Sequence, residues 1–161
     1  MVTIPEDLRK MLKDQKFIVI GSVDPNGVAN VSPRTAFYFA DDVVYWLDFF
    51  KHKSQGNFQV IPWISVAVFD KEKLLGFQMK GKVSTITDEL RKKRITESIS
   101  RSVTGKTSSK VFERLSQNKK PDVIEFHPKV VYSLSPEEES GKPLRCDKDG
   151  ETVAFFGRIT C

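Results

Sequence analysis

The stretch VANVSPRTAFYFADDVVYWLDFFKHKSQGNFQVIPWISVAVF, residues 28–69, decides the fold. It is dense in β-branched and aromatic residues, and turn signals punctuate it: DPNG ends just before it and ADD lies within it. This pattern is typical of consecutive antiparallel strands. The first three predicted strands cover residues 17–23, 28–39 and 43–49. Pro33 removes a ladder donor from the middle strand, so we expect a bulge or a bend there.

The rest of the chain alternates helix and strand patterns. KHKSQGNFQV has no strand pattern, and Ser54 is a candidate cap for a short helix that ends before Pro62. Further strands are predicted over residues 63–70, 74–87 and 121–135, the last of which would close the barrel. Helices are predicted for IPEDLRKMLKD capped by Thr3, TDELRKKRITESISR capped by Thr87, and KVFERLSQ after a flexible break. Their inward residues would be Leu8, Met11 and Leu12, then Leu90, Ile95 and Ile99, then Val111, Phe112 and Leu115. The predicted fold is therefore mainly β, a six-stranded antiparallel barrel with flanking helices.

Length and composition fit one soluble domain. The chain has 161 residues, 39% hydrophobic and 29% charged, and its apolar runs are far shorter than the roughly 20 residues that span a bilayer. The N-terminus has no secretory pattern, so reduced cysteines and a cytoplasmic location are expected. We expect a barrel over residues 1–135 and an extension over 136–161, packed on the barrel or on a partner subunit. The apolar cluster at 153–156 would be an added edge strand or a partner-binding tail.

The order of elements resembles the FMN-binding split barrels of the pyridoxamine 5'-phosphate oxidase-like superfamily. GVANVSPRTAFYFADDVVYWL is similar to the family's second and third strands, KHKSQGNFQVIPWISVAVF to its phosphate-helix-strand segment, and FQMKGKVSTITD to its long fifth strand. The resemblance covers roughly residues 4–135. It implies an FMN cofactor and a homodimer that holds the cofactor at its interface. True oxidases of this family carry a C-terminal Arg-x-His pair, and DGETVAFFGRITC has none, so we do not expect pyridoxamine phosphate oxidation.

The candidate phosphate site is FFKHKSQGNF, residues 49–58. A dianionic phosphate is bound by cations, a hydroxyl and free N–H groups at a helix start, although a solvated basic loop is the competing interpretation. The resemblance adds contacts on the second strand and the fifth, with Lys53, Ser54 and Arg34 as the main phosphate ligands. The predicted cofactor-binding residues are Val31, Ser32, Pro33, Arg34, Lys51, His52, Lys53, Ser54, Asn57 and Gln78.

Asp48 departs from the family pattern. The family often has Thr or Ser at this position, where the hydroxyl helps to bind phosphate. A carboxylate there opposes phosphate unless Arg34 or a lysine neutralises it. The sequence thus predicts that Asp48 points away, that FMN binds weakly, or that the ligand differs.

The function expected from the sequence is that of an FMN-dependent oxidoreductase or electron carrier that acts on a small redox substrate. No catalytic acid or base stands out, and neither histidine has a carboxylate at metal-ligand spacing. One alternative keeps the fold but replaces FMN with a deazaflavin or haem. Another is a ligand-free interaction module whose basic helices bind a partner or nucleic acid. Nucleic acid binding is not expected, because the net charge of +5 is modest and a solvated helix face explains LRKKRITESISR.

Overall fold

The computed structural model describes residues 2–50, 53–103, 106–136 and 141–156. The strands within these ranges are β1 (Ile18–Val23), β2 (Ala29–Arg34), β3 (Phe37–Ala40), β4 (Val43–Asp48), β5 (Trp63–Asp70), β6 (Leu75–Thr85), β7 (Asp122–Ser133) and β8 (Pro143–Cys146). The helices are α1 (Glu6–Asp14), α2 (Lys53–Val60), α3 (Glu89–Ser102), α4 (Lys106–Asn118) and α5 (Gly150–Phe156).

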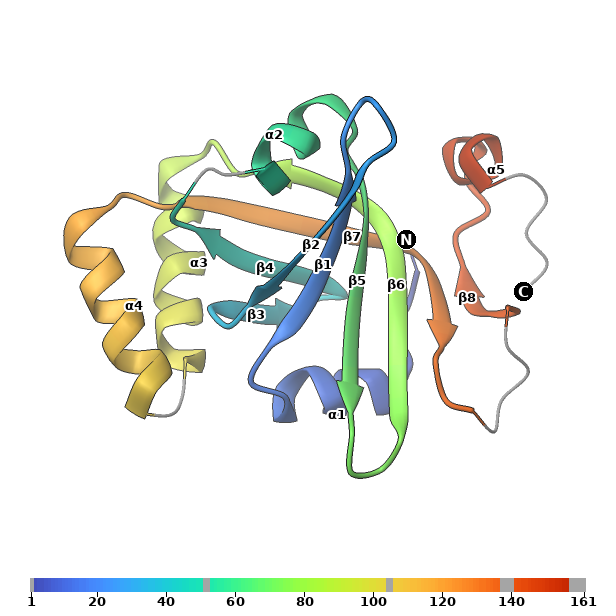
Figure 1. Cartoon of the computed structure of the whole chain (residues 1–161), viewed down its shortest axis with the longest axis horizontal. Helices are drawn as coiled ribbons and strands as arrows, with labels where there is room; N and C mark the ends of the chain where they lie inside the picture. Colours follow the sequence, from blue (N-terminus) through green and yellow to red (C-terminus); the bar gives the residue numbers. More distant parts are fainter. Residues whose placement is uncertain (1, 51–52, 104–105, 137–140, 157–161) are drawn as a thin grey trace.

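All strands form one curled antiparallel sheet with flanking helices (Figure 1). Its order is β2-β1-β5-β6-β7-β4-β3, and β8 pairs with β7 outside this path. Along one edge β7 pairs with β6, and along the other its first half pairs with β4 and its second half with β8. β7 therefore joins the β2-β1-β5-β6 side of the sheet to the β4-β3 side. The edge strands β2 and β3 are consecutive in the chain. The barrel is therefore split at the corner between them.

The expected antiparallel split barrel is confirmed, but the count of six strands is wrong. The strand predicted over 28–39 is two strands, because the chain bends at Thr35 and Ala36 and changes partners. Before the bend β2 pairs with β1, and after it β3 pairs with β4. Pro33 tolerates its place because β2 is an edge strand. The other additional strand is β8.

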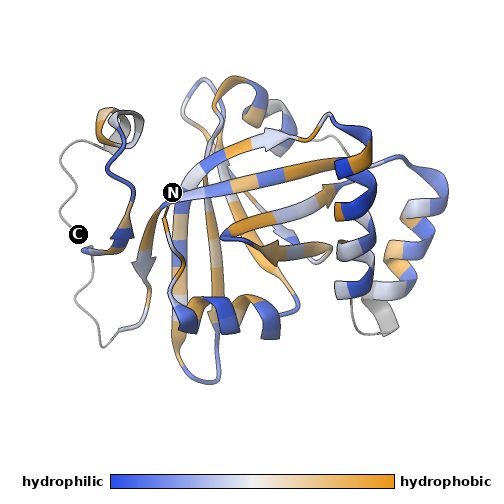
Figure 2. Cartoon of the chain, turned by 180° about the vertical axis from the view of Figure 1, so that it is seen from behind, coloured by the Kyte–Doolittle hydropathy of each residue, from blue (hydrophilic) through white to orange (hydrophobic). Residues whose placement is uncertain are grey.

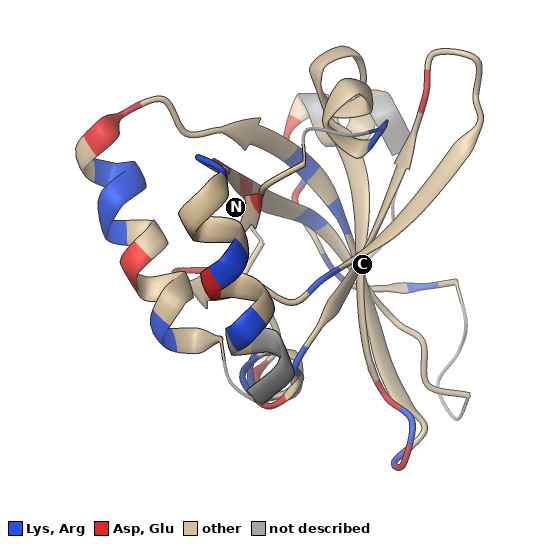
Figure 3. Cartoon of the chain, turned by 60° about the vertical axis from the view of Figure 1, so that its left-hand side comes forward, with Lys and Arg blue, Asp and Glu red and all other residues tan. Residues whose placement is uncertain are grey.

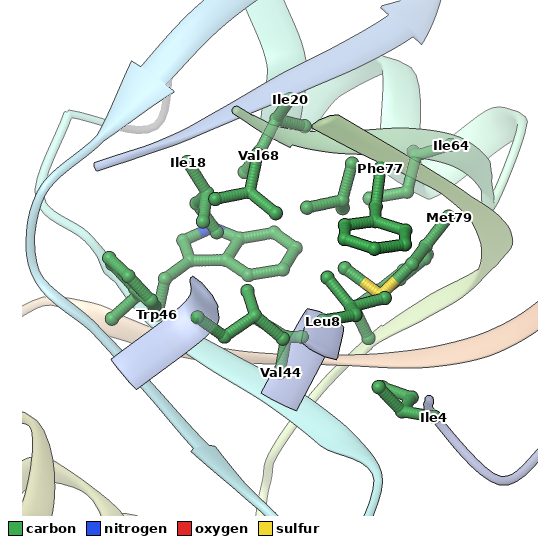
Figure 4. Packing of buried hydrophobic residues seen from close by; sticks show 14 of the residues in the cluster. Ile4, Leu8, Ile18, Ile20, Val44, Trp46, Ile64, Val68, Phe77 and Met79 are labelled. Atoms are coloured by element: carbon green, nitrogen blue, oxygen red, sulfur yellow. The ribbon is translucent and has the colours of Figure 1, made fainter. Parts of the chain in front are cut away.

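The core fills the inside of the curl (Figure 4). Trp46 is fully buried at its centre, against strand residues such as Ile18 and Val44. Leu8 of α1 reaches the same cluster, and Met11 and Leu12 are buried beside it, as predicted from their spacing. Hydrophobic residues recur along the strands (Figure 2), and burial alternates along β1, β5 and β6.

The helices depart from prediction mainly at their ends. Pro5, not Thr3, precedes α1 and provides no side-chain cap. Asp88, not Thr87, caps α3 by accepting a bond from the Arg91 N–H. Leu90 is wrong as an inward residue, since 75% of it is exposed in the first turn of α3.

A second, smaller apolar cluster lies under α3 and α4. Ile99 is fully buried there, and Ile95, Phe112 and Leu115 are partly buried beside it, as predicted. Val111 is 42% exposed. The predicted break before residue 110 is mostly helical, because α4 begins at Lys106.

The C-terminal extension pairs with the barrel through β8. The cluster at 153–156 is helical, in α5, so the edge strand expected there is wrong. Lys129 of β7 forms ion pairs with Asp147 and Asp149, which hold this segment. Cys146 is disulfide-bonded, so the expectation of reduced cysteines is wrong at this position, and Cys161 lies outside the described residues. No helix in the described ranges is long and apolar enough to cross a membrane.

Candidate functional site

A cavity of about 530 Å³, which we call the main cavity, lies between β2, β4, α2 and α4. Its volume is in the range of small-molecule sites. Its polar wall comprises Asn30, Ser32, Arg34, Asp48, Lys53 and Ser54. Its apolar wall comprises Ala36, Leu47, Phe49, Phe50, Val103, Val111, Phe112 and Leu115. The main cavity thus suits a ligand with one charged end and one apolar body.

One face of β2 supplies half of the polar wall. Side chains alternate along a strand, so Asn30, Ser32 and Arg34 share the half-buried face while Val31 and Pro33 share the exposed one. Val31 is 68% exposed and does not line the main cavity, whereas Pro33 lies at its rim.

The first turn of α2 supplies two more members of the polar wall, Lys53 and Ser54, and Asp48 comes from the end of β4. Ser54 is 5% exposed, and its Oγ lies 2.9 Å from Asn30 Nδ2 and 3.0 Å from Ser32 Oγ. Ser54 therefore joins α2 to β2 from inside the helix and is not the predicted cap. Lys53, which opens α2, is exposed and lies at the rim of the main cavity. The N–H groups of this first turn and the Lys53 ammonium form an anion-attracting corner.

Asp48 points into the main cavity and is neutralised by Arg34. Its Oδ2 lies 3.1 Å from Arg34 Nη2, and the side chain is only 5% exposed. Arg34 Nη1 also donates to Ser32 Oγ and to the Pro33 carbonyl, each at 3.0 Å. Arg34 Nε is buried and has no hydrogen-bond partner among the described residues. The prediction that Asp48 points away from the site is therefore wrong. Its charge is neutralised by Arg34, an outcome that the sequence allows.

The structure brings only part of the predicted set together. Ser32, Pro33, Arg34, Lys53 and Ser54 line the main cavity, while Lys51 and His52 lie outside the described residues.

The remaining predicted residues lie elsewhere. Asn57 lies on the buried face of α2. Its Nδ2 donates to Ser22 Oγ at 3.1 Å and ties the helix to β1. Gln78 lies on β6, opposite Ala67 and Tyr132, away from the main cavity.

Sequence reasoning missed Asn30 and the role of α4. Asn30 could have been found, because it lies two residues before Ser32 on the same face of a strand. The apolar wall carried no such signal. Its members Phe49 and Phe112 meet edge to face with centroids 5.9 Å apart, a contact between segments far apart in the chain.

A separate cavity of about 610 Å³, the outer-face cavity, lies between β6, β7 and the extension. His127 lines it, with Nε2 3.5 Å from Glu125 Oε2. Glu125 also accepts from Ser84 Oγ at 3.0 Å and pairs with Arg91 of α3. The hydrogen bond to Glu125 raises the pKa of Arg91. No group of three or more potential metal ligands occurs in the described part of the chain.

The split barrel and its amphipathic cavity define a class of small β-barrel proteins, and sequence comparison places the chain within it. The family model for pyridoxamine 5'-phosphate oxidase matches residues 4–135. The chain therefore belongs to the pyridoxamine 5'-phosphate oxidase family. No curated protein matches its sequence.

Solved structures share the fold at low sequence identity. HupZ of Group A Streptococcus is 17% identical with a TM-score of 0.60, over 86% of this chain and all of HupZ. HutZ of Vibrio cholerae, described as a heme storage protein, is 15% identical with a TM-score of 0.62, over 78% of this chain and 91% of HutZ. A Clostridium acetobutylicum protein of the pyridoxinephosphate oxidase family, related to general stress protein 26, is 11% identical with a TM-score of 0.64. The match covers 89% of this chain and 93% of that protein.

Proposed function

We propose that this chain is an FMN-binding flavoprotein, an oxidoreductase or electron carrier, and not a true pyridoxamine-phosphate oxidase. The observation that carries the proposal is the main cavity, in which a polar wall from β2, the end of β4 and the start of α2 faces an apolar wall formed mainly by residues 47–50 and α4. FMN has the matching division into a dianionic phosphate and a flat, largely apolar ring system. When bound, the flavin would supply the electron-transfer chemistry.

The polar wall offers what a phosphate requires. Lys53 and Arg34 supply positive charge, Ser54 and Ser32 supply hydroxyls, and α2 supplies N–H groups in its first turn. The buried Arg34 Nε is a donor without a partner among the described residues, and an anion in the main cavity would satisfy it. Asp48 opposes this by occupying another edge of the same guanidinium. The residues therefore fit FMN, with an affinity that Asp48 reduces.

The apolar wall would hold the ring system and exclude water from one of its sides. Phe112 and Leu115 of α4 face Leu47 of β4 and Phe49, which follows β4, in one cluster. Burying an aromatic ring against such side chains is favourable at roughly 25 cal/mol per Å². Because no described residue in the main cavity stands out as an acid or base, we assign no proton-transfer step to the chain.

The purified protein tests this proposal through its absorbance. We expect the two near-ultraviolet and visible bands of an oxidised flavin, either as purified or after adding FMN and removing the excess. A colourless protein that also leaves the fluorescence of added FMN unquenched would overturn the proposal. Shifted absorbance bands of a deazaflavin would keep the site and replace the cofactor.

Variants of α2 locate the phosphate. Lys53→Ala and Ser54→Ala should each weaken FMN binding, by roughly tenfold for one lost charged or hydroxyl contact. Gln59→Ala, on the exposed side of the same helix, is the matched control and should bind as the parent does. Equal retention of FMN by all three variants would show that the phosphate lies elsewhere.

We also propose a homodimer that completes the site. Gln78 lies on the outer surface of β6, away from the main cavity of its own chain, so it can meet only a cofactor held by a second copy. Light scattering after gel filtration should give twice the mass of one chain. A monomer that retains flavin would refute this part and leave the cofactor assignment intact.

Haem binding is the second candidate. Its support is the shared fold of HutZ, described as a heme storage protein, together with His127, which lines the roomy outer-face cavity. An imidazole is a common haem iron ligand. Titration with hemin would give a sharp Soret band that His127→Ala abolishes if this candidate is right, and a spectrum identical in both proteins excludes His127 as the ligand.

A further inference from the structure

A cavity of about 380 Å³ lies between the end of α1, β3 and the end of α3, and we call it the α1–α3 cavity. Three cationic side chains from separate segments line it: Lys13 of α1, Lys16 after α1, and Arg101 of α3. Its floor is apolar, with Leu12 and Phe37 buried beneath the cations.

No carboxylate among the described residues compensates the charge in the α1–α3 cavity. None of its lining residues is Asp or Glu, and among the described residues neither Lys13, Lys16 nor Arg101 has a carboxylate partner. Arg101 makes one long contact, 3.4 Å from its Nη2 to Ser98 Oγ. Like charges gathered over a low-dielectric floor attract an anion more strongly than the same charges spread over a surface.

The surrounding charge adds to this effect. Residues 89–120, which contain α3 and α4, hold ten Lys or Arg and three Asp or Glu, a net charge of +7. The whole chain is +5, so the remainder is −2. Basic positions accordingly stand out along α3 and α4 in Figure 3. The side of the protein that carries α3 and α4 is therefore its positive side, and Arg101 at the end of α3 belongs to it.

The α1–α3 cavity adjoins the main cavity. Thr35, at the corner where β2 ends and β3 has yet to begin, lines both of them. A molecule bound in the α1–α3 cavity would thus lie on the other side of this corner from the ligand of the main cavity.

We propose that the α1–α3 cavity binds an amphiphilic anion, a molecule with an apolar or aromatic body and a carboxylate, phosphate or sulfonate group. The cations hold the acidic group and the floor holds the body. Because the two cavities adjoin at Thr35, we assign this anion as the substrate class of the flavin proposed for the main cavity. This assignment rests on the proposed flavin function. The binding itself does not depend on flavin.

The test uses the full-length protein and two fluorescent probes that differ by one group. 8-Anilino-1-naphthalenesulfonate carries a sulfonate, and N-phenyl-1-naphthylamine is the same aromatic body without it. We expect the parent protein to bind the sulfonate probe more tightly than the neutral one, with the preference lost in high salt. Equal affinity for both probes overturns the proposal.

Substitutions then assign the binding to the cations. Lys13→Gln, Lys16→Gln and Arg101→Gln should each weaken the sulfonate probe by roughly fivefold, the effect of one exposed ion pair, and leave the neutral probe unchanged. Lys10→Gln and Lys93→Gln change the net charge equally at exposed positions outside the cavity and should bind as the parent does. If the controls lose as much as the cavity variants, the attraction is non-specific and the site does not exist.

Flavin content of the same proteins separates this proposal from the first one. If the protein binds no flavin but still shows charge-dependent probe binding, the proposed function is refuted and the anion site is supported. If the protein binds flavin but shows no charge-dependent probe binding, the proposed function is supported and the anion site is refuted.

Discussion

Replacing Asp48 with Asn should tighten FMN binding. The carboxylate lies 3.1 Å from the Arg34 guanidinium and is 5% exposed, so it is a fixed negative charge on the wall that would face a phosphate. Asn keeps the size of the side chain and an oxygen that can accept the contact from the Phe50 N–H, now 3.3 Å long. The substitution therefore removes charge with little change of shape.

The magnitude follows from Coulomb's law. Two anions on opposite sides of one guanidinium are ~7 Å apart, and at an effective dielectric of about 20 they repel by about 2 kcal/mol per unit charge. Solvent in the open cavity screens part of this repulsion. A net gain of about 1.4 to 2.8 kcal/mol is then expected, which is roughly a tenfold to hundredfold lower Kd.

The assay compares FMN with riboflavin, which lacks the phosphate. Quenching of flavin fluorescence gives both affinities, and the ratio of the two isolates the phosphate contribution. Asp48→Asn should raise the ratio of the affinity for FMN to the affinity for riboflavin and leave the riboflavin affinity unchanged. Glu72→Gln removes the same charge from the exposed β5–β6 turn and is the control. An unchanged or lowered ratio for Asp48→Asn would refute the placement of the phosphate beside Arg34.

Other parts of the fold yield predictions of their own. Lys129→Met should release the extension, seen as faster proteolysis and hydrogen exchange after residue 140. The hydrogen bond between the Lys129 ammonium and Asp149 lowers the pKa of Asp149 below the usual 3.8 and raises the pKa of Lys129 above 10.5. The ion pair therefore stops stabilising the extension when the pH falls through the lowered pKa of Asp149 or rises through the raised pKa of Lys129. Gly81→Ala should cost more than about 3 kcal/mol of unfolding free energy in a urea titration, because its Cβ would lie 2.1 Å from the His127 carbonyl oxygen. Leu90→Gln should change that free energy by less than about 0.5 kcal/mol, since Leu90 is 75% exposed, and a larger loss would mean that it packs against another chain.

The barrel was predictable because its signals are local. Turn residues and alternating apolar positions mark most strands, and the spacing of Leu8, Met11 and Leu12 marks α1. The split of the second strand into β2 and β3 was not predictable in the same way. Pro33 predicts a bulge or a bend in this strand, but only the exchange of β1 for β4 as partner, on either side of Thr35 and Ala36, shows that it is two strands.

The candidate site divides along the same line. Lys53 and Ser54 were predicted because a cation and a hydroxyl lie near a helix start in the sequence, and Arg34 was predicted from the family resemblance. Phe112 was assigned only to packing, because its place opposite Phe49 depends on how α4 folds back over β4. Residues that meet across the barrel leave no spacing in the sequence to detect.

Asp48 and its neighbours fix the position of the cationic Arg34 from within the chain. A guanidinium that is largely buried needs a counter-charge and acceptors, and Asp48, Ser32 and the Pro33 carbonyl supply them to Arg34 within the chain itself. The same contacts hold Arg34 in one orientation, so less side-chain entropy is lost when an anion arrives. A threonine or serine at this position would leave Arg34 unpaired until phosphate bound. In the proposed flavin site, the carboxylate would therefore lower the affinity for phosphate while it holds Arg34 in place, and such a site would suit a flavin that binds reversibly.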